Sequence, residues 1–157
     1  MDSVYLIMVD RFANGSTAND QSVDTASPTA WHGGDLAGIR SHLDYIERLG
    51  VSTVWITPIT RSRTEPIGGH PSWHGYWVAD GRAVDPRFGT LSELKALRED
   101  LHNRGMSLMM DLVLNHVGPE TPLTKTQPGW FRTNGDVIDW NDDAQRRTHD
   151  VHGLPDL

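Results

Sequence analysis

The residues best suited to chemistry stand in one short stretch, 107–118, where an apolar run turns polar. The run opens with Ser-Leu-Met-Met and is bracketed by glycines, which is typical of a buried strand, although a short apolar run can also belong to a buried helix. Asp111, Asn115 and His116 then interrupt it. If the strand continues, alternation puts Asp111 and Asn115 on one face, where a buried carboxylate and amide need polar partners. We expect those partners near the carboxyl end of the strand, because sheets built from βα units bind their ligands there.

The elements that must position this stretch alternate along the chain. Apolar runs predict buried strands at 4–9, at 51–57 and in the 107–118 stretch, and amphipathic stripes predict helices at 36–49 and 91–101. We expect Asp35 and Ser92 to begin the two helices and Gly50 and Gly105 to end them. This order predicts an α/β fold whose three parallel strands are joined by right-handed crossovers.

Polar loops separate these elements. A turn-rich loop follows the first strand, a long loop spans 59–90, and we expect irregular chain after Gly118. Loops as long as 59–90 are usually functional. This one contains the aromatic run Trp73-His74-Gly75-Tyr76-Trp77.

Composition excludes several classes of protein. The net charge is −7, from 14 basic and 21 acidic residues, and no basic run could follow a phosphate backbone, so we expect no nucleic-acid partner. No apolar run approaches the roughly 18 residues that would span a bilayer, so we expect no membrane partner. The absence of cysteine excludes disulfides and thiolate metal sites. No signal peptide is visible, because the first residues lead directly into a predicted strand, and the compartment is left open.

Seven stretches together carry a family resemblance. One is Asp111-Leu-Val-Leu-Asn115-His116, and the others follow the family's order over nearly the whole chain. They are Tyr5–Gly15 (YLIMVDRFANG), His32-Gly-Gly-Asp-Leu36, Trp55-Ile-Thr-Pro58, His74-Gly-Tyr-Trp77, Val84-Asp-Pro-Arg-Phe-Gly89 and Gly153-Leu-Pro-Asp-Leu157. Together they resemble the alpha-amylase family of glycoside hydrolases, whose catalytic domain is a (β/α)8 TIM barrel.

The resemblance implies that the chain is the N-terminal part of such a barrel. Residues 1–117 would form its first three βα units, with three parallel strands and two helices, and residues 118–157 would form a short, truncated insertion like the family's domain B. The family's catalytic carboxylates lie on the fourth and fifth strands and after the seventh, so no catalytic residue is expected in this chain. Asp111 matches a residue that orients its neighbours inside the barrel. The alternative is that Asp111 is itself a general acid or base.

The resemblance also implies contacts to sugar. His116 matches the histidine that bonds a hydroxyl of the sugar at the cleaved bond, and Tyr76 matches the aromatic residue that stacks on the same ring. His74 precedes Tyr76 in the same motif and is a further candidate. The alternatives are that Tyr76 packs in a core and that His116 is a hydrogen-bonded loop histidine.

Calcium sites are implied at two places. Asn115 and Asp156 match positions that hold the calcium between barrel and domain B, and further ligands would come from backbone carbonyls or from residues beyond Leu157, because calcium takes six to eight oxygens. Some family members have a second site after the first strand. The residues that fall on its pattern are Asn14, Ser16, Asn19, Asp20 and Asp35. Asn14 and Ser16 depart from the family's residues, which would weaken that site, and the alternative is a turn-rich loop without metal.

The implied function is hydrolysis or transfer on an alpha-glucan or maltooligosaccharide, by retaining double displacement. The remainder of its own barrel is the expected partner, because Met8, Trp55 and Met109 would otherwise lack a far wall. A secreted or periplasmic parent is compatible with the resemblance.

Two other interpretations remain. The chain could belong to a non-catalytic amylase-like binding or partner subunit, which the residues of the fourth and fifth strands would decide. It could also be an unrelated doubly wound α/β protein, although no glycine-rich phosphate loop follows the first strand.

Overall fold

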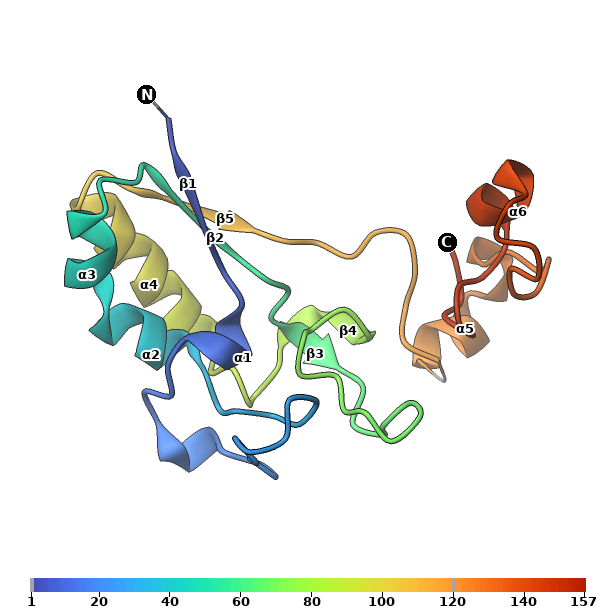
Figure 1. Ribbon diagram of the computed structural model, residues 1–157, viewed down its shortest axis with the longest axis horizontal. Coiled ribbons are helices and arrows are strands. Elements are labelled where there is room, and N and C mark those ends of the chain that lie inside the picture. The colour runs from blue at the N-terminus through green and yellow to red at the C-terminus, as the bar shows by residue number, and fades with distance from the viewer. Residues whose placement is uncertain (1, 120) are drawn as a thin grey trace.

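A computed structural model describes residues 2–119 and 121–157. In this part of the chain, the centre is a three-stranded parallel sheet in the order β1-β2-β5 (Figure 1). The strands are β1 (Val4–Ile7), β2 (Thr53–Ile56) and β5 (Ser107–Met110). In register, Trp55 lies between Leu6 and Met109. The predicted parallel arrangement is confirmed.

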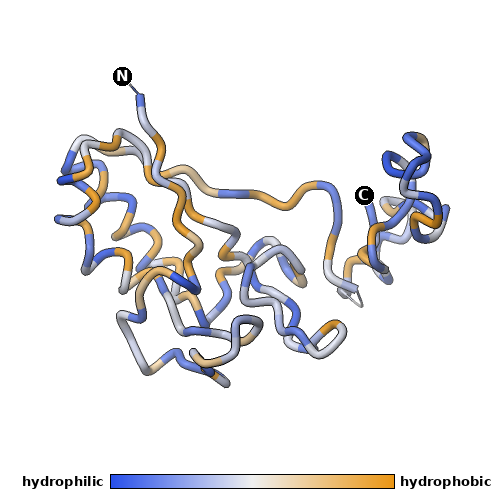
Figure 2. The backbone as a smooth tube through the Cα atoms, viewed as in Figure 1, coloured by the Kyte–Doolittle hydropathy of each residue, from blue (hydrophilic) through white to orange (hydrophobic). Residues whose placement is uncertain are grey.

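Helices cover one face of this sheet. α2 (Leu36–Ser41) and α3 (Leu43–Arg48) precede β2, and α4 (Leu91–Asn103) precedes β5. Figure 1 gathers all three on one side of the strands, and Figure 2 shows apolar residues recurring along them. The core lies between these two layers and includes Ile7, Ile39, Ile46, Val54, Ile56, Leu97 and Leu101.

The first strand is shorter than predicted. β1 ends at Ile7, and α1 (Val9–Phe12) makes one helical turn where the strand was expected to continue. Asp10 explains this turn, because its buried carboxylate accepts hydrogen bonds from the backbone N–H groups of His32 at 3.0 Å and Gly33 at 3.2 Å. A buried carboxylate requires such donors, and the turn brings it to them.

The helix predicted at 36–49 is two short helices that meet at His42. Ser41 Oγ donates to the carbonyl of Gly38 at 2.8 Å, and His42 Nδ1 lies 2.8 Å from the same carbonyl. Side chains that bond a helix carbonyl compete with the backbone ladder, which explains the break. The apolar stripe is confirmed from Leu36 to Ile46, since Leu36, Ile39, Leu43 and Ile46 are all buried, but Leu49, predicted as its last member, is exposed.

The start of α4 corrects the predicted cap. Thr90, not Ser92, is the N-cap: its Oγ1 accepts from the N–H of Glu93 at 3.2 Å, and the Glu93 carboxylate accepts from the N–H of Thr90 at 2.7 Å. This reciprocal capping box satisfies two N–H groups that the helix leaves open. Gly105 ends the helix as predicted, with a φ of 74° that favours glycine. Within 2–119 and 121–157, no helix is long and apolar enough to cross a membrane.

The long loop at 59–90 contains a hairpin that was not predicted. β3 (Thr60–Ser62) and β4 (Val78–Val84) pair antiparallel, with two irregularities in register. Asp85, directly after β4, holds the end of the hairpin against β3. Its buried carboxylate accepts a hydrogen bond from the N–H of Ser62 at 2.9 Å and forms an ion pair with Arg87 at 2.7 Å. The aromatic run 73–77 therefore lies in the excursion between two paired strands.

The third strand also ends early. The N–H of Asp111 bonds the carbonyl of Ile56 at 3.1 Å, but β5 stops at Met110, so the prediction of a strand through Asn115 is wrong past this point. The chain then runs extended to a separate C-terminal lobe (Figure 1). Short helices appear there where irregular chain was predicted: α5 (Pro122–Thr126), η2 (Pro128–Trp130) and α6 (Asp143–Thr148). The domain boundary predicted between residues 117 and 118 stays a prediction.

Candidate functional site

Tyr76 and Asp111 meet where the long loop passes the end of β5. The Tyr76 hydroxyl donates a hydrogen bond to Asp111 Oδ2 at 2.6 Å, a short charge-assisted bond. Burial, followed by the hydrogen bond and negative charge of Asp111, raises the pKa of Tyr76 to about 12. An ionised phenol would lose this bond and repel the carboxylate. Tyr76 therefore stays protonated and tethered at neutral pH.

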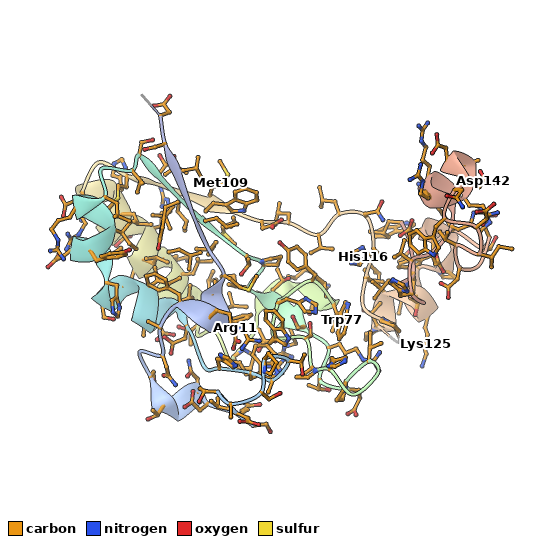
Figure 3. The ribbon with its side chains drawn as sticks, in the orientation of Figure 1. Arg11, Trp77, Met109, His116, Lys125 and Asp142 are labelled. Atoms are coloured by element: carbon orange, nitrogen blue, oxygen red, sulfur yellow. The ribbon has the colours of Figure 1, made fainter. Side chains whose placement is uncertain are left out.

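His116 joins the same group through the backbone. Its Nε2 lies 3.0 Å from the carbonyl of Tyr76, and because a carbonyl only accepts, this nitrogen carries a proton. Two residues further on, the N–H of Gly118 donates to the carbonyl of Val78 at 2.7 Å, so the two segments stay in contact. Figure 3 shows His116 between the sheet and the C-terminal lobe. The imidazole is thus fixed beside Tyr76 by neighbouring backbone.

His74 and Gly75 shape the turn that presents Tyr76. His74 Nδ1 accepts from the N–H of Tyr76 at 3.0 Å, and the two rings stack at 5.8 Å between centroids. Burial, then the neighbouring His116, lowers the pKa of His74, which keeps the ring neutral and able to accept. Gly75 has a φ of 83°, and a Cβ there would lie 2.0 Å from the carbonyl oxygen of Pro58, so only glycine fits.

The three residues predicted to bind sugar therefore come together with Asp111, which was predicted to orient its neighbours. Tyr76, His74, Asp111 and His116 are all half-buried, and Tyr76 lies outside the buried core. A tethered aromatic ring beside an imidazole and a carboxylate is suited to a flat, polar ligand such as a sugar ring. Their contacts to sugar remain predictions.

Asn115 and Asp156, predicted to share a calcium ion, also meet. Asn115 Nδ2 donates to Asp156 Oδ1 at 2.7 Å. Asp156 is buried, and its burial raises its pKa, against the opposing effect of Arg132, whose Nη1 lies 3.7 Å away. A buried carboxylate of this kind is stabilised in its charged form by a further cation. Asp156 could supply oxygen to calcium, whereas Asn115 faces it with an amide nitrogen and would have to turn its amide over to offer its oxygen, and calcium needs six to eight oxygens.

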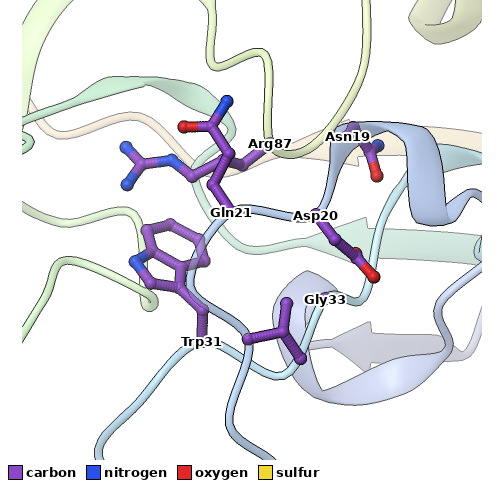
Figure 4. Close-up of a pocket in the computed structure, with 7 residues that line it drawn as sticks. Asn19, Asp20, Gln21, Trp31, Gly33 and Arg87 are labelled. Carbon is purple, nitrogen blue, oxygen red and sulfur yellow. The ribbon is translucent and has the colours of Figure 1, made fainter.

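The loop after β1 holds the second predicted calcium set, around η1 (Thr17–Asn19). Asn14 Nδ2 donates to both carboxylate oxygens of Asp20, at 2.9 and 3.0 Å. Asn19 Oδ1 is buried and has no hydrogen-bond partner among the described residues. A small cavity of about 10 Å³ lies against Asn19, Asp20 and Gly33 (Figure 4). An orphaned amide oxygen beside a carboxylate fits the ligand chemistry of calcium.

Gly33 leaves space beside Asn14 and Asp20 because it has no side chain. A Cβ on Gly33 would approach Asn14 Nδ2 to 2.6 Å and Asp20 Oδ1 to 2.8 Å. Arg87 lines the far side of the cavity, but its charge is paired with Asp85. Asn19 and Asp20 are therefore compatible with an ion, whereas Asn14 turns its amide nitrogen toward Asp20 and does not line the cavity.

Asp35 caps α2 as predicted, and this role competes with its predicted role as a metal ligand. Its Oδ1 accepts from the N–H groups of Gly15 at 3.0 Å and Gly38 at 2.6 Å, and its Oδ2 accepts from the N–H of Ser16 and from Asn19 Nδ2. These four donors use the acceptor capacity of the carboxylate, so in this arrangement Asp35 fits a helix cap and not a metal ligand. No group of three or more His, Cys, Asp or Glu converges within 2–119 and 121–157. Calcium binding would therefore depend on one carboxylate at each place, Asp156 or Asp20, together with asparagine and carbonyl oxygens.

Two cation–π contacts beside the site were not predicted. Arg11 lies 3.9 Å from the ring centroid of Trp73, and Arg87 lies 4.1 Å from that of Trp31. Arg11 also donates to the carbonyl of Ala30 at 2.9 Å, so it ties the first loop to the loop that carries Tyr76. Sequence patterns do not reveal such pairs, because their members are far apart in the chain.

Comparisons with known proteins agree with this architecture. A family model described as "Alpha amylase, catalytic domain" matches residues 6–144. The chain is 36% identical to a beta/alpha-amylase of Paenibacillus polymyxa, over 99% of this chain and 14% of that protein. It is 30% identical to a cyclomaltodextrin glucanotransferase of Klebsiella oxytoca, over 99% of this chain and 28% of that protein.

A solved structure gives the same result for the fold. The alpha-amylase of Anoxybacillus superposes with a TM-score of 0.88 at 39% identity, over 99% of this chain and 34% of that one. The chain thus spans about a third or less of the relatives it matches, and the sheet described above corresponds to the N-terminal part of their TIM barrel.

Proposed function

The chain belongs to the alpha-amylase family of glycoside hydrolases, and from this premise we propose that it forms one sugar-binding wall of a retaining, alpha-glucan-active enzyme. The observation that carries the proposal is the 2.6 Å bond from Tyr76 to Asp111, with His116 held 3.0 Å from the Tyr76 carbonyl. These groups gather at the carboxyl ends of β2 and β5, the end at which barrels of this kind bind their substrates.

Each residue has a distinct role in the proposal. Tyr76 offers its ring to the C–H face of a pyranose, and His116 bonds a hydroxyl of the same sugar. Asp111 is a positioning residue, because it acts through the Tyr76 hydroxyl, and His74 holds the turn. The proposal covers both hydrolysis and transfer, since the relatives include a protein named as an amylase and one named as a glucanotransferase.

The catalytic carboxylates come, in this proposal, from the rest of the barrel. A retaining mechanism needs two carboxyl groups about 5 to 5.5 Å apart, as nucleophile and acid/base. Asp111 is the carboxylate beside Tyr76, and its Oδ2 is engaged by the phenol. We therefore expect this chain alone to leave starch, maltodextrin and a nitrophenyl maltoside unhydrolysed. Turnover by the pure chain that Asp111→Asn abolishes would contradict this.

Calcium is part of the proposal at two places. Asn115 with Asp156, and Asn14 with Asn19 and Asp20, would hold the ions once the amides of Asn115 and Asn14 turn their oxygens toward them, while Asp35 caps α2. Bound calcium would supply positive charge that stabilises the ionised form of these carboxylates, which burial or neighbouring groups disfavour. Calorimetric titration should detect binding that Asn115→Ala weakens, and a chelator should lower the melting temperature of the full-length protein. If titration shows no heat of binding and a chelator leaves the melting temperature unchanged, the calcium proposal is wrong.

Kinetics of the full-length protein test the central roles. Tyr76→Ala and His116→Ala should each lower kcat/KM on a maltooligosaccharide tenfold or more, roughly 1.4 kcal/mol. Tyr45→Ala is the matched control, because Tyr45 is an exposed tyrosine on α3, and it should leave kcat/KM unchanged. Unchanged kinetics in both variants would refute the assignment. A full-length protein that binds maltooligosaccharides without turnover would identify a non-catalytic subunit instead.

A further inference from the structure

A larger cavity lies between the β3–β4 hairpin and the C-terminal lobe. Its volume is about 640 Å³, within the range of small-molecule sites. Val78 and Val117 line its apolar part, Asp80, Arg82 and Gln127 are polar groups in its lining, and Trp130 lies on the lobe side. We call it the Trp130 groove. It shares no lining residue with the group formed by His74, Tyr76, Asp111 and His116.

Hydrogen bonds hold the two walls of the Trp130 groove together. The N–H of Gly118 donates to the carbonyl of Val78 at 2.7 Å, and Thr121 Oγ1 donates to the carbonyl of Ala79 at 2.7 Å. Thr121 is itself buried. Because these bonds join the hairpin directly to the chain that leads into α5, the groove is preformed and does not require a ligand to assemble it.

The groove combines an aromatic surface with polar groups of balanced charge. Trp130 is 60% exposed, which is unusual for so large an apolar ring. Asp80 and Arg82 form a 3.1 Å ion pair whose charges cancel. A neutral rim does not select an anion or a cation. It suits an uncharged ligand that presents both C–H faces and hydroxyl groups, which is the chemistry of a sugar chain.

A protein partner is less well matched to this surface. Protein interfaces bury a wide, well-packed patch with an apolar centre. Among the described residues that line the groove, Trp130 is the one large apolar side chain that is exposed. A single exposed ring in the lining is instead an arrangement that can stack on one sugar unit.

We propose that the Trp130 groove is a second binding site for an alpha-glucan chain, with Trp130 as the stacking surface and with Asp80, Arg82 and Gln127 as hydrogen-bonding groups. The proposal rests on the proposed function, which supplies the glucan as ligand. Residues 76–82 run from Tyr76 into the wall of the groove. A polymer held in the groove therefore remains close to Tyr76, and its local concentration there is raised.

The test uses the full-length protein and affinity electrophoresis in gels that contain amylopectin. Trp130→Ala should weaken retention by amylopectin at least fivefold, and its effect should be larger for the polymer than for maltotriose. Trp130→Phe keeps a flat ring and should recover part of the retention. Trp140→Ala is the matched control, since Trp140 is also exposed (49%) on the C-terminal lobe, packs against His152 and does not line the groove.

The outcomes separate this proposal from the proposed function. If wild-type protein turns over maltooligosaccharides but Trp130→Ala and Gln127→Ala both retain full amylopectin binding, the groove proposal is overturned and the proposed function stands. If Trp130→Ala and Trp140→Ala weaken binding equally, the groove is also excluded. If Trp130→Ala changes the sedimentation coefficient and leaves glucan retention intact, the groove is occupied by a second copy and the proposal is wrong.

Discussion

The two faces of the central sheet are built from the same strands but differ in burial. Helices pack on one face, and the opposite face is largely exposed to solvent. On the helix face, Ile7, Val54 and Ile56 are at most 1% exposed. On the opposite face, Val4 and Leu6 are each 53% exposed and Met109 is 45% exposed. Successive residues of a strand point to opposite faces, so neighbours as similar as Leu6 and Ile7 have opposite environments.

This contrast shows which part of the structure the chain completes by itself. α2, α3 and α4 supply the outer layer of a barrel, and nothing among the described residues supplies the layer opposite. Apolar side chains on an uncovered face are typical of a surface that another part of the protein covers. Of the three residues expected to need a far wall, Met8 and Met109 are exposed and Trp55 is half-buried, and their cover by the remainder of the barrel stays a prediction.

Substitutions of the neighbours Ile7 and Leu6 should give the largest difference in stability between the two faces of the sheet. In the isolated chain, Ile7→Ala should lower the free energy of unfolding by about 2–5 kcal/mol, because it leaves a cavity in the core. Leu6→Ala should lower it by less than about 1 kcal/mol, because little burial is lost. Urea unfolding followed by hydrogen exchange measures both. In the full-length protein the cost of Leu6→Ala should rise, and equal costs in the isolated chain would contradict the two-face account.

Association of the isolated chain is the next expected effect. β1 and β5 are edge strands with apolar side chains on the uncovered face, which favours pairing between chains. At micromolar concentration the chain should elute from gel filtration ahead of a monomer. Leu6→Glu with Met109→Glu should shift it toward the monomer. A wild-type chain that elutes as a monomer at this concentration would show that the open face is stable in water.

A smaller effect concerns Tyr76, at the end of the sheet where the uncovered face meets the long loop. Its pKa of about 12 lies above the ordinary value of 10, so its contribution to stability is complete below pH 10 and is lost as pH rises toward 12. Asp111→Asn removes the charge and should move the pKa of Tyr76 back toward 10. Tyrosinate absorbance, with Tyr76→Phe as the blank, measures this. An unchanged pKa in Asp111→Asn would mean that burial alone sets it.

Local patterns predicted much of the fold. Strand-length apolar runs and helical stripes located the sheet and its covering layer, because burial on one face leaves a period in the sequence. The break at His42, the cap at Thr90 and the β3–β4 hairpin were missed, because each depends on particular hydrogen bonds and not on periodicity. The third strand was predicted to continue past Met110, because apolar residues continue in the sequence. Its pairing with β2 ends at Met110, so the strand ends there.

The candidate site was predicted as a set of residues and not as a geometry. Motifs pointed to Tyr76, Asp111 and His116, but the bond between the first two joins parts of the chain that only the fold brings together. Asp35 was predicted both as a helix cap and, because it falls on the family's calcium pattern, as a metal ligand, and its four N–H partners became visible only in the structure. Trp130 carried no distinguishing signal among six tryptophans.

The most direct measurement is a structure of the full-length protein with a bound maltooligosaccharide. The account predicts a sugar ring stacked on Tyr76 within about 4 Å, the distance of ordinary van der Waals contact, with His116 bonded to a hydroxyl of the same sugar. It also predicts that the Tyr76–Asp111 bond persists and that other strands of the barrel cover Leu6 and Met109. A sugar bound elsewhere, with the Tyr76 ring covered by protein, would contradict the account.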